Sequence, residues 1–334
     1  MEGSSAAAPI PIIDISPALR SSGVSDHRVV AARLREAITS VGFVQVVGHG
    51  FDRSLLDDAY DAMRAVEVDW TAEQRASMDR PRASSRGLFR RWDDDGFLDR
   101  MIFQFIPYDD VADAEAKGAC RGRTDFFAPN VWPDFDPAFT DTWKRYEEAS
   151  RFLCRVLLDL FADALDLPFD FFEPVSSRDV TLHSVNWYPP QPAGAIGDEA
   201  VVLNPAHADS GLVTLLHQRG SYEGLEVRVD GDWVKVPAID EAFVVNIGHL
   251  MRRVTNGTWP ATIHRVVSGT TVDDERHSIA THFIPDIDAV LGPVPSTIDA
   301  GGPRFAPIST YAWQQEFMER YVLDQWSDAN ASAR

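Results

Sequence analysis

Apolar residues in the first half of the chain recur mainly at the spacing of a helix. Val30, Leu34 and Ile38, for example, fall four residues apart and would form one apolar stripe. This periodicity predicts three helices, over residues 27–41, 55–66 and 137–165. The apolar run at 43–47 predicts a buried strand. Residues 80–136, by contrast, are rich in Arg, Asp, Gly and Pro and predict a long irregular connection.

After residue 179 the pattern changes to short runs of β-branched and aromatic residues, separated by Gly, Asp-Gly and Asn-Gly turns. Eight strands are expected, over residues 180–188, 200–203, 212–218, 224–229, 232–236, 242–247, 262–267 and 277–284. So many short strands predict a double-sheet jelly roll. The last segment returns to helical spacing, with Ser309 or Thr310 as its N-cap.

We therefore expect an α+β fold with a double-stranded β-helix (jelly-roll) core. Helices from the N-terminal region and a C-terminal helix would support this core. Because no Gly-, Ser- or Pro-rich linker divides the chain, we expect one structural unit. Its parts are a flexible tail at 1–8, a mostly helical region at 9–175 that packs on the barrel, the jelly-roll core at 176–300, and a C-terminal helix at 301–334.

The composition narrows the possible partners. Of the 334 residues, 45% are hydrophobic and 25% are charged, which is ordinary for a globular protein. The formal net charge of −20 argues against nucleic acid and membrane surfaces as partners, since both attract basic patches. The expected partner is a small-molecule substrate, and nothing in the pattern indicates an oligomeric state.

Two further features bear on the cellular setting. Cys120 and Cys154 are the only cysteines, and without a C-x-x-C motif they predict neither a disulfide framework nor a thiolate zinc site. No apolar stretch reaches the length of a transmembrane helix, and the N-terminus lacks the features of a signal peptide. A reducing, cytoplasmic location is therefore expected.

The strongest candidate for chemistry is His207-Ala208-Asp209, followed 57 residues later by His264. Side chains at i and i+2 of a strand point to the same face, so His207 and Asp209 would converge. Two imidazoles and one carboxylate are the facial triad of a non-haem iron(II) site, which leaves positions open for O2 and a co-substrate. A histidine alone is more often a core residue, but of the nine histidines only His207 has an acid two residues later.

A second candidate follows on a later strand, where Arg276 and Ser278 would share one face. A guanidinium with a neighbouring hydroxyl suits a carboxylate ligand. Upstream, Asn186 and Tyr188 would also share a face, and Tyr188 could donate a further hydrogen bond. The alternative for Arg276 is a surface salt bridge with the acids at 273 and 274.

Taken together, these motifs resemble the isopenicillin N synthase-like family of iron(II)/2-oxoglutarate dioxygenases. The resemblance runs in order over most of the chain. Its segments are Pro11-Ile12-Ile13-Asp14, Gly42-Phe43 to Gly48-His49-Gly50, Asn130-Val131-Trp132-Pro133, Asn186-Trp187-Tyr188-Pro189-Pro190, His207-Ala208-Asp209-Ser210-Gly211, Thr214-Leu215-Leu216, Gly224-Leu225-Glu226-Val227, Trp233-Val234-Lys235-Val236-Pro237, Val245-Asn246-Ile247-Gly248, Thr255-Asn256-Gly257, His264-Arg265-Val266 and Arg276-His277-Ser278. Trp187 replaces the family's usual Tyr, and His249 stands where an Asp usually follows.

The resemblance implies roles for these residues. If the protein belongs to this family, His207, Asp209 and His264 would hold the iron(II). The co-substrate 2-oxoglutarate would place its distal carboxylate against Arg276 and Ser278, with Tyr188 and Asn186 assisting. With O2, the reaction would yield succinate, CO2 and a hydroxylated, desaturated or cyclised product. The Lys-poor, Arg- and Ala-rich composition is typical of high-GC bacteria and suggests specialised metabolism such as antibiotic biosynthesis.

Candidate substrate contacts are weaker. Arg90 and Arg91 stand beside aromatic residues and could contact a substrate carboxylate or phosphate, although pairing with the neighbouring acids at 93–95 is the simpler alternative. Four aromatic residues could line an apolar pocket, or equally belong to the core: Phe103, Phe105, Phe283 and Phe317.

Two alternatives to this function stay open at this point. One is an oxidase of the same fold that uses no 2-oxoglutarate, in which Arg276 and Ser278 would bind the substrate's own carboxylate. The other is a catalytically silent ligand-binding relative, against which the intact set of three ligands argues.

Overall fold

The fold is built on one large and one small β-sheet. The computed structural model describes residues 10–20, 24–81, 84–92, 98–190, 200–271 and 273–322. The large sheet has the strand order β1 (Ile12–Asp14), β2 (Phe43–Val47), β10 (Phe243–Ile247), β7 (Val213–Gly220), β12 (Arg276–Phe283), β5 (Leu182–Tyr188), β4 (Leu98–Phe105) and β3 (Gly87–Trp92). Only β1 and β2 pair in parallel; the other neighbours are antiparallel.

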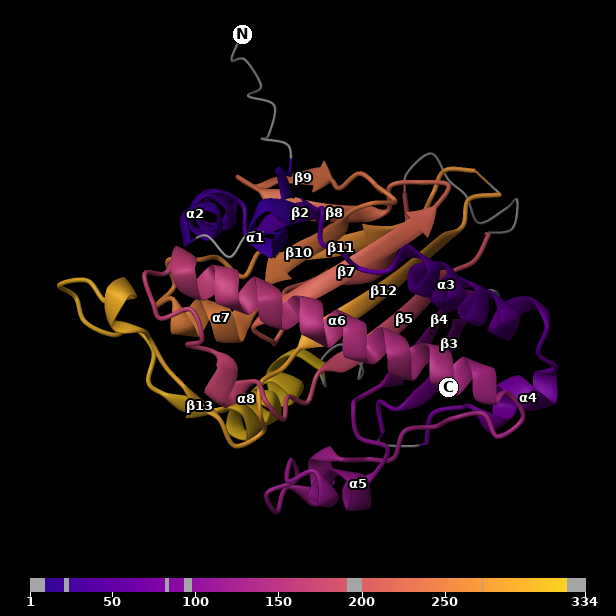
Figure 1. Cartoon of the computed structure of the whole chain (residues 1–334). Coiled ribbons are helices and arrows are strands. Elements are labelled where there is room, and N and C mark those ends of the chain that lie inside the picture. Colours follow the sequence, from indigo (N-terminus) through magenta and orange to yellow (C-terminus); the bar gives the residue numbers. More distant parts are fainter. Residues whose placement is uncertain are drawn as a thin grey trace, which may run out of the picture.

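The small sheet lies over one part of the large sheet (Figure 1). Its strands follow the order β6 (Val202–His207), β11 (His264–Val267), β8 (Leu225–Val229) and β9 (Asp232–Lys235), all antiparallel. A separate short pair joins β13 (Val290–Leu291) to β14 (Ile308–Ser309). The eight strands expected after residue 179 therefore all exist, within a few residues of their predicted bounds.

The helices of the described residues are α1 (Ser16–Arg20), α2 (Val24–Ser40), α3 (Arg53–Val68), α4 (Ala72–Ser77), α5 (Val111–Ala116), α6 (Pro137–Ala164), α7 (His249–Val254) and α8 (Thr310–Phe317). Helix α6 lies across the face of the large sheet away from the small sheet, and α2 and α3 pack against α6, whereas α5 lies apart from both sheets (Figure 1). Single helical turns occur at Thr124–Phe126, Glu173–Val175, Pro295–Thr297 and Met318–Val322. As predicted, Ser309 caps α8, because its side chain accepts a hydrogen bond from the Ala312 amide.

Helix α6 is the central support of the large sheet. Asp136 caps its first turn by accepting from the Phe139 amide, and Pro137 fits the first helical position because its missing N–H would have no partner there. The helix crosses the sheet diagonally (Figure 1) and buries Trp143, Tyr146 and Leu157 in the main core. Each fully buried apolar side chain of this size contributes about 1.5–3 kcal/mol.

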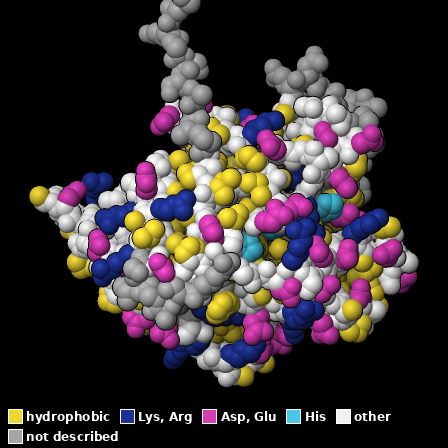
Figure 2. Space-filling view, turned by 45° about the horizontal axis from the view of Figure 1, so that its top comes forward, with side chains coloured by type: hydrophobic (Ala, Val, Ile, Leu, Met, Phe, Trp, Pro, Cys, Tyr) yellow, Lys and Arg dark blue, Asp and Glu magenta, His cyan; other side chains and the backbone are white. Residues whose placement is uncertain are grey.

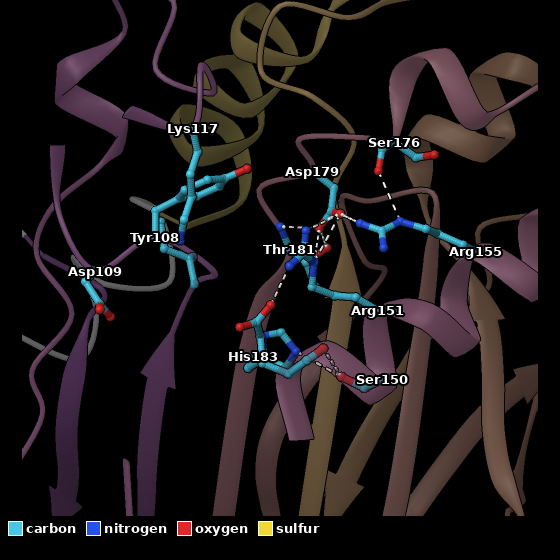
Figure 3. Close-up of polar contacts among 12 residues, drawn as sticks. Tyr108, Asp109, Lys117, Ser150, Arg151, Arg155, Ser176, Asp179, Thr181 and His183 are labelled. Atoms are coloured by element: carbon cyan, nitrogen blue, oxygen red, sulfur yellow. Dashed lines mark hydrogen bonds and ion pairs between the residues drawn. The ribbon is translucent and has the colours of Figure 1, made fainter. Parts of the chain in front are cut away.

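A buried polar cluster fixes α6 to the beginning of β5 (Figure 3). The fully buried Asp179 carboxylate accepts hydrogen bonds from Arg151 at 2.8 Å and from Arg155 at 2.6 Å, both on α6. Further along, Ser150 of the helix lies 3.1 Å from Nε2 of His183 on β5. A buried carboxylate is tolerated only with such partners, so this cluster sets the position of the strand that carries Asn186 and Tyr188.

The region 80–136 differs from the predicted irregular connection. It contains the hairpin of β3 and β4, in which Phe89 pairs with Ile102, and β4 continues the sheet next to β5. Arginines and other polar residues interrupt the apolar alternation of both strands, so the period of a strand is hidden. The N-terminal region thus supplies four strands as well as helices.

Charged side chains of both signs are interspersed on the face shown in Figure 2, with hydrophobic side chains gathered towards its middle. Charged side chains of the described residues also form ion pairs, such as Arg219 with Asp57 at 2.6 Å, and pairs that are open to solvent contribute little to stability. Within the described ranges, no helix combines the length and the apolar character needed to cross a lipid bilayer.

Candidate metal centre

His207, Asp209 and His264 lie together and could hold one metal ion. Oδ1 of Asp209 is 3.8 Å from Nε2 of His207 and 3.8 Å from Nε2 of His264. One ligand atom from each of the three residues lies within 4.8 Å of the others. Bonds from a transition metal to such atoms are about 2.0–2.2 Å long, so a single ion can bridge them.

The pairing of β6 with β11 closes the gap of 57 residues between the histidines. His264 is the direct partner of His207 in this register, and their ring centroids are 4.3 Å apart. Both imidazoles are oriented through Nδ1, which lies 2.7 Å from the Pro205 carbonyl in His207 and 3.2 Å from the Thr262 carbonyl in His264. Since a carbonyl only accepts, Nδ1 carries the proton and Nε2 presents its lone pair to the metal position.

The Asp209 carboxylate is held in the same way. Its Oδ2 accepts hydrogen bonds from Thr214 at 2.6 Å and from Asn246 at 2.7 Å, which leaves Oδ1 facing the two histidines. Burial acts to raise the pKa of Asp209, but the neighbouring imidazoles and the Asn246 amide outweigh it and hold the pKa below its usual value. Burial, together with His264, lowers the pKa of His207 to about 4. At neutral pH Asp209 is therefore ionised and His207 is neutral, as metal binding by these two residues requires.

Asp209 reaches this position from a loop rather than from the strand that we predicted. β6 ends at His207, and the chain turns towards the large sheet at residues 208–211. The turn packs so closely that a Cβ on Gly248 would lie 2.4 Å from the Gly211 carbonyl oxygen. The amide of His249, at the beginning of α7, donates to the Asp209 carbonyl at 2.8 Å and fixes the loop.

Arg276 is fully buried and faces the same cavity. Its guanidinium donates to Ser278 at 3.3 Å and to Gln218 at 3.0 Å, and it lies over the Tyr188 ring, 5.4 Å from the centroid. Among the described residues no carboxylate pairs with it, and its Nε has no hydrogen-bond partner. A buried cation without an anion is costly, so this position suits the carboxylate of a ligand. The surface salt bridge with the acids at 273 and 274 is not formed.

A cavity of about 180 Å³ joins the metal position to Arg276. It is lined by the three proposed metal ligands and by all four residues predicted to contact 2-oxoglutarate, namely Asn186, Tyr188, Arg276 and Ser278. Its wall also contains polar residues to which sequence reasoning gave no role: Arg100, Gln104, Ser184, Asn204, Thr214, Asn246 and His282. Thr214 and Asn246 lay inside quoted motifs, whereas nothing local marked Arg100 or His282.

The predicted substrate contacts fall elsewhere. Phe103, Phe105 and Phe283 are buried in the main hydrophobic core and do not line the cavity, because their side chains point to the helix-covered side of the large sheet. Arg90 pairs with Asp79 at 2.7 Å, and Arg91 donates to the Leu203 carbonyl. Phe317 packs beside Trp313 and His249, near α7. These placements give no support to a role of the six residues in substrate binding.

Comparison with known proteins identifies the family. The model of the 2OG-Fe(II) oxygenase superfamily matches residues 180–285, and a model described as non-haem dioxygenase in morphine synthesis N-terminal matches residues 10–134. A 2-oxoglutarate-dependent dioxygenase from Didymella fabae is 30% identical over 308 residues, covering 84% of this chain and 87% of the relative. The chain belongs to the 2OG-Fe(II) oxygenase superfamily.

Other members are similar over nearly their full length. The 2-oxoglutarate-dependent dioxygenase citB of Monascus ruber is 29% identical over 330 residues, covering 93% of this chain and 94% of the relative. A putative 2OG-Fe(II) oxygenase family protein from Caulobacter crescentus has a similar structure, with a TM-score of 0.79, 23% identity and coverage of 94% and 99%. A Neurospora crassa protein in complex with alpha-KG gives a TM-score of 0.80 at 20% identity, with coverage of 96% and 100%. The last two similarities concern the fold.

As a superfamily member, the protein is a non-haem iron(II) 2-oxoglutarate-dependent dioxygenase. The predictions of family, enzyme class and cofactors are thus confirmed. The donor set fits iron(II), because two imidazoles and one carboxylate converge on one point. Of the two co-substrate alternatives, the named relatives favour 2-oxoglutarate.

Proposed function

We propose that this enzyme hydroxylates an unactivated C–H bond of a polar small molecule, with desaturation or ring closure as related outcomes. In this proposal the two sheets form a double-stranded β-helix around the cavity, and the remaining N-terminal and C-terminal segments support it. The composition supports a role in bacterial specialised metabolism, as in antibiotic biosynthesis.

One observation carries the proposal. The cavity holds, on one side, three convergent metal ligands and, on the other, the buried guanidinium of Arg276 without an acidic partner among the described residues. Bound iron(II) supplies the activation of O2 that the protein's own side chains cannot provide. A ligand with two carboxylates can therefore occupy the cavity from the metal position to Arg276.

The side chains of the chain divide the remaining work. His207, Asp209 and His264 hold the metal, while Arg276 and Ser278 bind the distal carboxylate of 2-oxoglutarate. The Tyr188 ring contacts two guanidiniums, those of Arg276 and Arg100, at 5.4 and 5.3 Å from its centroid. These contacts restrict the positions that 2-oxoglutarate can take. Because Asp209 is retained, a halogenase, in which halide replaces the carboxylate, is disfavoured.

The polar wall of the cavity supports a polar substrate. Arg100 donates to Asn186 at 2.7 Å and to Asn204 at 3.0 Å, so it spans from the large sheet to the small sheet. Gln104 and Ser184 add an amide and a hydroxyl, linked at 2.7 Å. A relative from Hordeum vulgare is named 2'-deoxymugineic-acid 2'-dioxygenase, and a similar structure was solved with JA. We propose that the substrate presents a hydrogen-bond acceptor, such as a carboxylate, to Arg100.

The test is a metabolite screen with the purified enzyme, Fe(II), 2-oxoglutarate and isotopically labelled O2. Mass spectrometry should detect a product that has gained one labelled oxygen atom or lost two hydrogens, formed together with succinate. Arg100→Gln should raise the KM for that substrate. The same substitution should change the rate of succinate formation in the absence of substrate by a smaller factor. A product formed equally well without 2-oxoglutarate would contradict the proposal.

A further inference from the structure

His282 is a third histidine at the metal centre, and neither the family motif nor the ligand set accounts for it. It lies on β12, directly opposite Thr214 of β7, and lines the cavity. Its Nδ1 is 3.7 Å from Oδ1 of Asp209, the same oxygen that faces the two histidine ligands. It does not belong to the group of side chains that converge on the metal position, so its role must differ from that of a ligand.

The hydrogen bonds around Thr214 determine which nitrogen of His282 carries the proton. Oγ1 of Thr214 is 2.6 Å from Oδ2 of Asp209 and 3.2 Å from Nδ1 of His282. A hydroxyl has one proton to donate, and an ionised carboxylate can only accept. Thr214 therefore donates to Asp209, and His282 must donate from Nδ1 to the Thr214 oxygen.

The result is a directed chain of hydrogen bonds from His282 through Thr214 to Asp209. A hydroxyl can rotate, and without a donor on its other side Thr214 could turn its proton towards cavity water instead. With His282 in place, the Thr214 hydroxyl keeps donating its proton to Oδ2 of Asp209, to which Asn246 also donates. Oδ1 is then the oxygen left for the metal.

We propose that His282 is a positioning residue for the Asp209 ligand and acts through Thr214. The inference rests on the proposed metal site, because it assigns His282 a role in holding one of its ligands. According to this proposal, positioning Asp209 requires the hydrogen-bond donor at Nδ1 of His282. The second ring nitrogen, Nε2, is not required.

Asparagine and glutamine distinguish these two properties. The side-chain amide nitrogen of asparagine can occupy nearly the position of Nδ1 of histidine, whereas the amide of glutamine extends to the position of Nε2. His282→Asn should therefore retain the function, and His282→Gln and His282→Phe should lose it. Thr214→Val removes the intermediate link, and Thr214→Ser keeps it.

The experiment measures Co(II) affinity of the full-length protein anaerobically, by competition with a chelator, together with the visible spectrum of bound Co(II), which reports its coordination geometry. We expect His282→Phe and His282→Gln to weaken binding about tenfold and to change the spectrum, as for other groups that orient metal ligands. The Co(II) affinity of His282→Asn should stay within about threefold of that of the native protein. The double variant His282→Phe, Thr214→Val should bind no more weakly than Thr214→Val alone, because both residues act in one chain.

Several results would overturn the inference. These are native affinity in both His282→Phe and His282→Gln, failure of His282→Asn to restore binding, or multiplying effects in the double variant. If His282→Phe unfolds the protein, as seen by circular dichroism, the comparison of His282→Asn with His282→Gln still tests the role of Nδ1. Failure of the native protein to bind Co(II) would instead reject the metal site itself. This outcome can be distinguished from failure of the inference about His282.

Discussion

The side-chain amide of Asn246 donates a hydrogen bond to Oδ2 of Asp209 across 2.7 Å, with both side chains buried. Asn246 lies on β10 of the large sheet, whereas Asp209 follows the last strand residue of β6 in the small sheet. This contact therefore ties the metal ligand to the sheet opposite its own strand. It also leaves Oδ1 available between the two histidines.

Replacing Asn246 with Leu should weaken iron binding without unfolding the protein. The buried carboxylate would keep only Thr214 as a donor to Oδ2, and its orientation would become less fixed. Loss of such a partner typically lowers metal affinity about 10–100-fold. Competition with a chelator measures the Fe(II) dissociation constant. Asn130→Leu is a suitable control, since that amide links the loop around Ile106 and Tyr108 and should not alter iron binding.

Arg276→Gln should greatly raise the 2-oxoglutarate requirement. A charged hydrogen bond to a buried carboxylate contributes about 1.5–3 kcal/mol, so the concentration giving half-maximal succinate formation should increase roughly 10- to 100-fold. Arg276→Lys should lie between, because it keeps the charge but not the forked geometry. Arg219→Gln, on the adjacent strand but turned to Asp57, should behave like the native enzyme. An unchanged requirement in Arg276→Gln would rule out this anion site.

His217 should make the folded state less stable in acid. It is fully buried, and burial lowers its pKa from 6.5 to about 4, although the Asp240 carbonyl acts in the opposite direction. Between these values the unfolded chain binds a proton that the folded chain does not. The free energy of unfolding should thus fall by about 1.4 kcal/mol per pH unit as the pH decreases in this range.

The His217→Gln variant provides the comparison. Its unfolding free energy is measured by chemical denaturation at several pH values. The slope of this free energy against pH should correspond to uptake of about one proton fewer on unfolding than in the native protein. The groups facing His217, namely Tyr60, Arg219, Asp240 and His49, remain in both proteins. Equal slopes would show that His217 does not stay neutral.

Asp179 should be essential for stability although it is distant from the reaction. Asp179→Ala would leave Arg151 and Arg155 of α6 without the carboxylate that both contact. Breaking a buried ion pair from one side costs about 3–5 kcal/mol, and we expect the lower end because Arg155 can reach solvent. Thermal and denaturant unfolding measure the loss. Asp166→Ala, which breaks the exposed pair with Arg35, should cost less than about 1 kcal/mol.

The sequence predicted those parts of the fold whose periodicity is intact. The strands after residue 179 are short runs of β-branched and aromatic residues between turn signals, and Arg276, Ser278, Asn186 and Tyr188 were expected on shared faces and now line one cavity. The β3–β4 hairpin was missed because polar residues such as Arg100 and Gln104 face that cavity and interrupt the apolar pattern. Propensity and pattern do not reveal which distant strands pair.

The metal ligands illustrate the same limit. The motif identified His207 and Asp209, but placing both on one strand was wrong, since the chain leaves β6 before Asp209. Close packing of Gly211 against Gly248 and hydrogen bonds from α7 hold that loop, and both are long-range features. His282 and Thr214 likewise meet only through the register of β12 with β7. Local sequence does not contain that register.

The central claim is that 2-oxoglutarate binds between the His207–Asp209–His264 metal site and Arg276. The most direct test is an anaerobic titration of the Fe(II)-loaded protein with 2-oxoglutarate, followed by the visible charge-transfer absorption of the chelate, which requires no substrate. The native protein should develop this band, Asp209→Ala should not, and Arg276→Gln should need far more 2-oxoglutarate. A native protein that binds Fe(II) but shows no band, or a band unaffected by Asp209→Ala, would contradict the account.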